Sequence, residues 1–581
     1  MGAVKRTFRT LDQTRTLMAV ARGEAPPEML ITGGTILNVY SGESLPGTVA
    51  VAAGRIAYVG GRTFESGSAT TTIDARDRVI VPGYVDPHAH PHALYTPDQM
   101  ARTVLPLGTT TVVADTLPLL MLGHRDRIEE ALTALADLPL RYFWFIRLHG
   151  QAHGPEEAAF MTDDLLERLM DREDVRSAGE LTRWPRVYAG DPTVLRQMAV
   201  ALTRGRRVEG HAPGVSADRL QVLAAAGVSS EHEAMTADQA LTRLRAGFYV
   251  MLRHGGLRPD LPALAAVATG PRAASGRLML TPDGASPAFL RAHGYMDHVL
   301  ENAMRAGIDP VASYQMASMN PAAYYGLDEE IGGIAPGRRA DLAILERLEQ
   351  PRPEVVIAGG KVVAMAGRLL AEFPTLPWDT WLRPLARGTW RPDPSFFTLD
   401  SLPHPTPGVH MENAVITARR DISHDGALPP GVLRLVLVDP AGRWRCRTLL
   451  SGFADEVGGL ASTYSSTAGI LTIGHNAEDM AAAAARALDL GGGIVLAEQG
   501  TIRFELPLPL GGMMSPKPVG TLATDIERIG ALLRARGYRH HDLTYTLLFM
   551  SFDSLPYVRI TYRGLWDVMA EREILPREDL A

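Results

Sequence analysis

The sequence predicts an α/β protein: a (β/α)8 barrel, a small β-sandwich formed from both flanks of that barrel, and a C-terminal α+β domain. Strand-like apolar runs alternate with helical stretches through the middle of the chain. Two separate segments with period-two alternation bracket this middle region, and a further α+β region follows a stretch rich in proline and tryptophan. A chain of 581 residues also exceeds what one hydrophobic core supports, so several domains are expected.

The flanks of the predicted barrel carry the β-sandwich. After a helical segment over 1–27, residues 29–60 alternate apolar and polar side chains between glycine-rich turns, which is typical of a small antiparallel sheet. The same pattern returns near 335–370. We therefore expect residues 28–80 and 330–372 to form one composite β-sandwich.

The middle segment, 81–329, is expected to form the barrel. Its strand-like runs include TTTVVAD, YFWFIRL and RRVEGHAP, and helical stretches such as ADRLQVLAAAG separate them. A doubly wound sheet is the alternative, but the segment has no glycine-rich phosphate turn of the GxGxxG type. In a (β/α)8 barrel the functional groups gather at the carboxyl ends of the strands.

The remainder divides into two parts. Residues 373–410 are rich in proline and tryptophan and are expected to be a linker or docking segment. Residues 411–581 are expected to form the α+β domain, with one helix after GHNAEDM and another at IERIGALLRARG.

Composition excludes several classes of function. The net charge of −7 and the pI near 6.2 argue against nucleic-acid binding, which requires a basic surface. The longest apolar runs are too short to cross a membrane, and the first residues lack the apolar segment of a secretory signal. A single cysteine, Cys446, excludes an intrachain disulfide and a thiolate metal cluster. The expected location is the cytoplasm.

A His-x-His motif follows the first predicted barrel strand, in VPGYVDPHAHPH. His88 and His90 are two residues apart, so on a strand both side chains leave the same face. Imidazole nitrogens are the ligands that borderline divalent metals prefer. Alone, the motif is weak evidence, because histidines in surface loops are common.

Other strand ends strengthen the interpretation. His211 closes RVEGHAPG, His232 lies one β/α unit later in SSEHEA, and Asp283 ends RLMLTPDG. Each residue alone is more simply explained as a capping or solvent-facing polar group. Their order at successive strand ends favours a shared metal site, with Asp283 also a candidate catalytic residue.

A site for two metals also needs a bridging group, and the lysine count constrains it. Many such barrels use a carboxylated lysine, but lysine occurs only at Lys5, Lys361 and Lys517, outside the predicted barrel. The bridge must then be Asp or Glu, and Glu180 in VRSAGELTRW is the best-placed candidate. Its alternative role is an ion pair with one of the neighbouring arginines.

This ligand set predicts hydrolysis. A divalent ion lowers the pKa of its bound water to about 7, which supplies hydroxide at neutral pH. Asp283 would accept the proton of that water and pass it to a leaving group. Such a site attacks an amide carbonyl or an amino-substituted ring carbon.

The chain resembles the adenine deaminase family of the metal-dependent amidohydrolase superfamily. The resemblance covers nearly the whole length, through PGYVDPHAH, the segment from HAPGVSADRL to LRHG, IGGIAPGRRADLAIL, GILTIGHNAEDM and ELPLPLGGMMS. It implies conversion of adenine to hypoxanthine and ammonia in purine metabolism, at a centre of one or two ions in which manganese is favoured and iron or zinc are alternatives. By resemblance, the metal-ligand positions are those of His88, His90, Glu180, His211, His232 and Asp283.

The chain departs from the family on the substrate side. The usual Glu-Ser-Ser after the first strand is replaced by Pro-His-Ala around His92, and the usual Asp-Pro-His-Glu after the second strand begins here at Asp115 but continues Thr-Leu-Pro. We expect His92, Asp115 and His149 to face the substrate; His149 and His153 lie after the third strand, where a solvated loop is the alternative. These changes mark a divergent branch.

Three hypotheses follow. The first is an aminohydrolase acting on adenine or a related amino-substituted heterocycle. The second is a hydrolase of amides or cyclic amides that uses the same metal site, and the third is a non-catalytic relative. The expected partners are a small heterocyclic substrate and further copies of the chain, most simply as a homodimer, with neither nucleic acid nor membrane.

Overall fold

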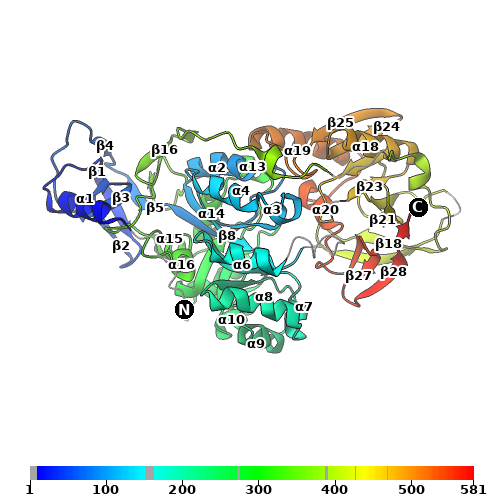
Figure 1. Ribbon diagram of the computed structural model, residues 1–581, viewed down its shortest axis with the longest axis horizontal. Coiled ribbons are helices and arrows are strands. Elements are labelled where there is room, and N and C mark those ends of the chain that lie inside the picture. The colour runs from blue at the N-terminus through cyan, green and yellow to red at the C-terminus, as the bar shows by residue number, and fades with distance from the viewer. Residues whose placement is uncertain are drawn as a thin grey trace.

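The computed structural model describes residues 9–150, 162–270, 275–385, 390–424, 427–467 and 469–580. Figure 1 shows three regions side by side along the longest axis of the molecule: a β-rich region (blue), a central barrel with its helices, and a C-terminal domain coloured from yellow to red. Within the described ranges, no helix combines the length and apolar character that crossing a membrane requires.

Eight parallel strands form the barrel sheet. Their order is β13-β12-β11-β10-β9-β8-β7-β6, so each strand pairs with its neighbour in sequence. The Thr281 hydroxyl at the end of β13 donates to the His88 carbonyl oxygen of β6 at 3.0 Å, which brings the sheet close to closure. The strands are β6 (Tyr84–Ala89), β7 (Thr109–Asp115), β8 (Arg141–Ile146), β9 (Val175–Leu181), β10 (Arg207–Gly210), β11 (Ser230–Glu231), β12 (Tyr249–Arg253) and β13 (Leu278–Thr281).

Successive side chains of these strands point alternately to the inside and the outside of the barrel and pack into two hydrophobic cores. Val85, Val113 and Phe145 pack together inside the barrel, whereas residues one position away, such as Val112 and Trp144, pack in the cluster that contains the helices. The helices are α2 (Pro97–Val104), α3 (Leu117–Leu122), α4 (Ile128–Ala136), α6 (Asp163–Asp171), α7 (Trp184–Tyr188), α8 (Pro192–Thr203), α9 (Ala217–Ala225), α10 (Ala237–Arg245), α11 (Leu261–Leu264), α12 (Ala266–Thr269), α13 (Pro287–Ala292), α14 (Met296–Arg305), α15 (Pro310–Met316) and α16 (Met319–Tyr324).

Both flanks of the barrel join in one nine-stranded sheet. Its order is β17-β16-β15-β14-β5-β1-β2-β3, with β4 beside β1, and Ile31, Val49 and Leu342 share its apolar core. Thr10 caps helix α1 (Leu11–Arg22), which packs on this sheet through Leu17. The strands are β1 (Met29–Asn38), β2 (Glu43–Ala52), β3 (Arg55–Gly60), β4 (Thr71–Asp74), β5 (Val79–Pro82), β14 (Leu342–Leu345), β15 (Val355–Ala358), β16 (Lys361–Met365) and β17 (Arg368–Leu369).

The segment after this sheet docks on the barrel. Helix α17 (Trp378–Trp381) places both of its indoles against barrel helices. Trp378 Nε1 donates to Asp98 Oδ1 at 2.8 Å, and Trp381 Nε1 donates to Glu130 Oε1 at 3.1 Å. These two bonds fix the path of the chain toward the C-terminal domain.

The C-terminal domain contains a second nine-stranded sheet, of order β19-β18-β21-β20-β23-β22-β24-β25 with β29 beside β21, and a three-stranded sheet, β26-β27-β28. Its helices are α18 (Ala477–Asp489), α19 (Val519–Arg534) and α20 (Leu543–Phe549), and α20 lies next to the barrel (Figure 1). The strands are β18 (Thr406–Met411), β19 (Thr417–Ile422), β20 (Val432–Val438), β21 (Trp444–Ser451), β22 (Gly459–Ser462), β23 (Ile470–Gly474), β24 (Gly493–Glu498), β25 (Thr501–Pro507), β26 (Val558–Thr561), β27 (Gly564–Asp567), β28 (Arg572–Pro576) and β29 (Glu578–Asp579).

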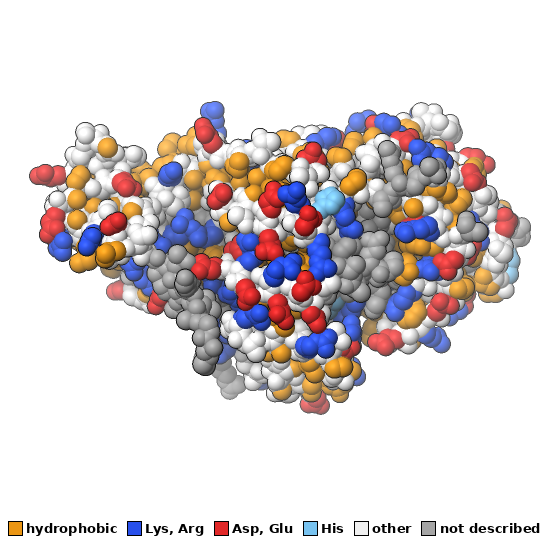
Figure 2. Space-filling model, in the orientation of Figure 1, with side chains coloured by type: hydrophobic (Ala, Val, Ile, Leu, Met, Phe, Trp, Pro, Cys, Tyr) orange, Lys and Arg blue, Asp and Glu red, His pale blue; other side chains and the backbone are white. Residues whose placement is uncertain are grey.

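The visible surface carries mixed charge. Figure 2 shows basic and acidic side chains interspersed over the barrel helices on the face that it presents. Many of them form ion pairs, such as Arg168 with Glu129 at 3.0 Å and with Asp164 at 2.8 Å. This face therefore presents no extended patch of one sign.

Candidate active site

The barrel brings six histidine and carboxylate side chains together at the carboxyl ends of its strands. Each belongs to a strand end or to the residues directly after it, as a parallel sheet requires for groups that meet at one edge. They are His88 (β6), His90 (after β6), Glu180 (β9), His211 (after β10), His232 (after β11) and Asp283 (after β13).

Glu180 lies at the centre of this cluster. Its Oε1 is 3.3 Å from His232 Nε2 and contacts His211 Nδ1, while its Oε2 is 4.0 Å from His90 Nε2. Asp283 Oδ1 lies 2.9 Å from His90 Nε2 and 3.7 Å from His88 Nε2. The two carboxylates therefore connect all four imidazoles.

The donor set fits a divalent transition metal. His88 Nε2 and His211 Nε2 are buried and have no hydrogen-bond partner among the described residues. Nitrogen and carboxylate donors within one coordination sphere suit zinc, iron and manganese alike. Three overlapping groups have ligand atoms within 4.8 Å of one another: His88, His232 and Asp283; His88, His90 and Glu180; and Glu180, His211 and His232.

Two further carboxylates orient the His-x-His motif. Glu209 Oε2 lies 3.1 Å from His88 Nδ1, and Asp115 Oδ2 lies 3.0 Å from His90 Nδ1. Each carboxylate fixes one ring nitrogen and leaves Nε2 facing the cluster, as metal-binding histidines require. Glu209 is not among the sequence-predicted residues, although its spacing of two from His211 on one strand puts both side chains on one face.

Asp115, expected to face the substrate, lines the pocket but its oxygens already have partners. Arg147 donates to it through Nε at 3.0 Å and through Nη2 at 2.7 Å, in addition to the contact with His90. Burial raises the pKa of Asp115, but the charges of Arg147 and His90 outweigh this effect and hold the pKa below its usual range. The side chain thus orients His90 within a buried ion-pair network.

Two buried arginines balance the negative charge of the cluster. Arg147 Nη2 is 2.5 Å from Glu180 Oε2, so this guanidinium joins Asp115 to Glu180. Arg253 Nη1 is 2.5 Å from Glu233 Oε1 and 3.0 Å from Asp283 Oδ2. Neither arginine was expected from the sequence, because an arginine at the end of a strand has no local pattern that marks it as a charge partner.

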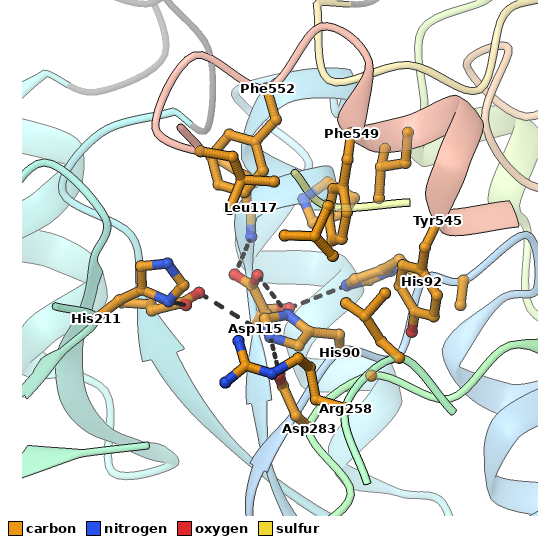
Figure 3. Close-up of a pocket in the computed structure, with 18 of the residues that line it drawn as sticks. His90, His92, Asp115, Leu117, His211, Arg258, Asp283, Tyr545, Phe549 and Phe552 are labelled. Carbon is orange, nitrogen blue, oxygen red and sulfur yellow. Dashed lines mark hydrogen bonds and ion pairs between the residues drawn. The ribbon is translucent and has the colours of Figure 1, made fainter. Parts of the chain in front are cut away.

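A pocket of about 980 Å³, a volume that includes the solvent at its open mouth, lies over this cluster. Figure 3 shows His90, Asp115 and Asp283 on one side and Tyr545, Phe549 and Phe552 of the C-terminal domain on the other. Further apolar walls come from Leu117, Leu257, Val415, Met513, Leu548 and Leu555. The C-terminal domain therefore closes the barrel mouth with apolar and aromatic groups.

The two other residues expected to face the substrate differ in position. His92 lines the pocket, and its Nε2 donates to the Asp115 carbonyl oxygen at 2.9 Å. His149 is buried outside the pocket lining, with its Nδ1 3.2 Å from the Gly150 carbonyl oxygen. His153 lies outside the described residues.

Arg559 anchors the part of the C-terminal domain that covers the pocket. The side chain is buried, and Nη1 donates to the Phe549 carbonyl oxygen at 3.2 Å and Nε to that of Leu555 at 3.4 Å. Its Nη2 donates to the carbonyl oxygens of Pro556, at 2.7 Å, and Val415. Three of these four carbonyls belong to residues that line the pocket.

Replacing Arg559 with methionine should loosen this cover. Each buried carbonyl oxygen that loses its charged donor should lower the stability of this region by about 1–3 kcal/mol. We therefore expect faster amide exchange across residues 549–558 and a higher KM. The metal content should change little. Hydrogen exchange read by mass spectrometry measures the effect. Arg419→Met, at an exposed pair with Asp421 in the same domain, is the control; equal exchange in both variants would contradict the anchoring role.

Similarity to known proteins identifies the family of the chain. Residues 79–363 match the amidohydrolase family, and residues 412–572 match the adenine deaminase C-terminal domain. A Bacillus subtilis protein, YerA, is 35% identical, and the match covers 98% of this chain and 99% of that protein. This chain belongs to the adenine deaminase family.

Other family members are similar over the same extent. An adenine deaminase of Rubrobacter xylanophilus is 34% identical and one of Moorella thermoacetica is 31% identical, each match covering 96% of both chains. Members of the amidohydrolase family are hydrolases, so this member of the adenine deaminase family is an enzyme that acts on C–N bonds. The matches to these relatives include both the barrel and the C-terminal domain.

Proposed function

We propose that this chain is a metal-dependent adenine deaminase, which converts adenine and water to hypoxanthine and ammonia. The observation that carries the proposal is the meeting of six metal-type donors beneath a pocket whose cover comes from the adenine deaminase C-terminal domain. The expected cytoplasmic location and homodimeric assembly are part of the same proposal.

In this proposal His88, His90, Glu180, His211, His232 and Asp283 hold one or two divalent ions, manganese being favoured and iron or zinc the alternatives. A bound ion of this kind lowers the pKa of a coordinated water to about 7 and supplies a nucleophile at neutral pH.

In this proposal the side chain of Asp283 transfers the proton from the attacking water to the leaving group. Asp283 Oδ1 faces the centre of the cluster, while Arg253 holds its Oδ2 at 3.0 Å. Oδ1 accepts a proton from the attacking water and delivers it to the amino group that leaves as ammonia. His92 lines the pocket from the first strand end and contacts the substrate.

Hydrolysis of amides or cyclic amides is the second candidate. The apolar side chains of Leu117 and Pro118, two and three residues after Asp115, favour it because they offer no hydrogen bond to a purine. The test loads the protein with manganese and measures ammonia release from adenine beside ring opening of lactams and imides. Release from adenine supports the first candidate; ring opening without ammonia release supports the second, and a protein that binds no metal excludes both.

A further inference from the structure

The pocket contains a phenol hydroxyl that the proposed chemistry does not use. Tyr545 lines the pocket from helix α20, and the residue is 6% exposed. Its hydroxyl is buried and has no hydrogen-bond partner among the described residues. Buried hydroxyls nearly always have a partner, so this one calls for a ligand.

The position of the hydroxyl is fixed from both domains. Asp542 accepts hydrogen bonds from the Tyr545 amide at 3.2 Å and from the Ser286 hydroxyl at 2.8 Å, which ties the start of α20 to the loop after β13. Phe549 packs beside the phenol ring at a centroid distance of 5.5 Å.

On the barrel side, Gly284 leaves room for the Tyr545 hydroxyl. A Cβ on Gly284 would lie 2.1 Å from Tyr545 Oη, so only glycine permits this approach. Gly284 directly follows Asp283, which places the hydroxyl next to the residue that would transfer the proton. Figure 3 shows Tyr545 reaching from α20 toward His92 and Asp283.

We propose that Tyr545 is a specificity-determining residue, whose hydroxyl donates a hydrogen bond to an acceptor atom of the substrate ring. The ligand class is a neutral planar heterocycle with a ring nitrogen or carbonyl oxygen, because the walls that the C-terminal domain contributes around Tyr545 are apolar and aromatic. This inference rests on the proposed aminohydrolase function and adds a residue from the C-terminal domain to its substrate site.

The test compares Tyr545→Phe with Tyr538→Phe. The Tyr538 hydroxyl is buried in the same domain but already pairs with the Thr546 hydroxyl at 2.9 Å, outside the pocket. We expect Tyr545→Phe to raise KM for adenine about tenfold without lowering the Tm, since it removes a hydroxyl with no partner. Tyr538→Phe should lower the Tm and leave KM unchanged.

Substrate analogues identify the acceptor atom. With 1-deaza-, 3-deaza- and 7-deazaadenine, one analogue should show a raised KM in the wild type, and Tyr545→Phe should remove that difference. An unchanged KM in Tyr545→Phe, or a fall in Tm like that of Tyr538→Phe, would overturn the inference.

A failure of the proposed function gives a different result. If the manganese-loaded wild type releases no ammonia from adenine, thermal shifts with adenine, hypoxanthine and hydantoin replace KM as the readout. A compound that stabilises the wild type but not Tyr545→Phe then supports the role of Tyr545. Equal shifts in the two proteins, or no shift in the wild type, exclude it.

Discussion

Asp283→Asn should lower kcat by about 10³-fold, because an amide cannot accept the proton of the attacking water. Asparagine has nearly the shape of aspartate and tolerates the left-handed backbone that Asp283 adopts, at φ 65°. The fold is therefore retained, and the other five donors hold most of the metal. Steady-state kinetics and metal analysis on one preparation measure both effects.

The matched control is Asp191→Asn. Asp191 caps helix α8 by accepting hydrogen bonds from Thr193 N and Val194 N, and asparagine caps as well as aspartate does. This variant should keep wild-type kcat and metal content. Wild-type turnover in Asp283→Asn would remove Asp283 from the role of proton carrier.

Arg147→Leu should lower the free energy of unfolding of the metal-free protein by about 3–5 kcal/mol. The Arg147 side chain is fully buried, and its removal takes the guanidinium away from Asp115 and Glu180, which are 3% and 4% exposed and keep only imidazoles as side-chain partners. Urea unfolding in the presence of a chelator measures the loss. Added manganese should restore part of it, because a cation at Glu180 replaces some of the missing positive charge.

Arg168→Leu is the control for this prediction. Arg168 also bridges two carboxylates, Glu129 and Asp164, but its side chain is 47% exposed. Removing a pair in solvent costs about 1 kcal/mol or less. Equal losses in the two variants would show that the buried network contributes no more than a surface pair.

Much of the architecture was predictable from local patterns. The alternation of strands and helices predicted the barrel, and the period-two segments at 29–60 and 335–370 predicted a β-rich region built from both flanks. The positions of His88 and Asp283 at strand ends were equally visible, since a barrel gathers its strand ends at one face.

The roles of other residues depended on partners far away in sequence. Asp115 was expected to face the substrate and lines the pocket, while Arg147, directly after the next strand, donates hydrogen bonds to its oxygens. His149 follows a strand end, yet its ring packs outside the pocket lining. A single sequence does not indicate which polar group a neighbouring strand will satisfy.

The sequence by itself determined the chemistry available to this protein: histidine and carboxylate donors at successive strand ends of a barrel, in a chain whose barrel segment lacks lysine. Tertiary structure alone decided which of those groups remain free and what covers them. Tyr545, more than 250 residues beyond Asp283, reaches the site through the docking of α20 on the barrel mouth, and Arg559 anchors the covering residues 549–558. The physical reason is that strand-end placement follows from local periodicity, whereas the pairing of buried polar groups depends on contacts between distant segments.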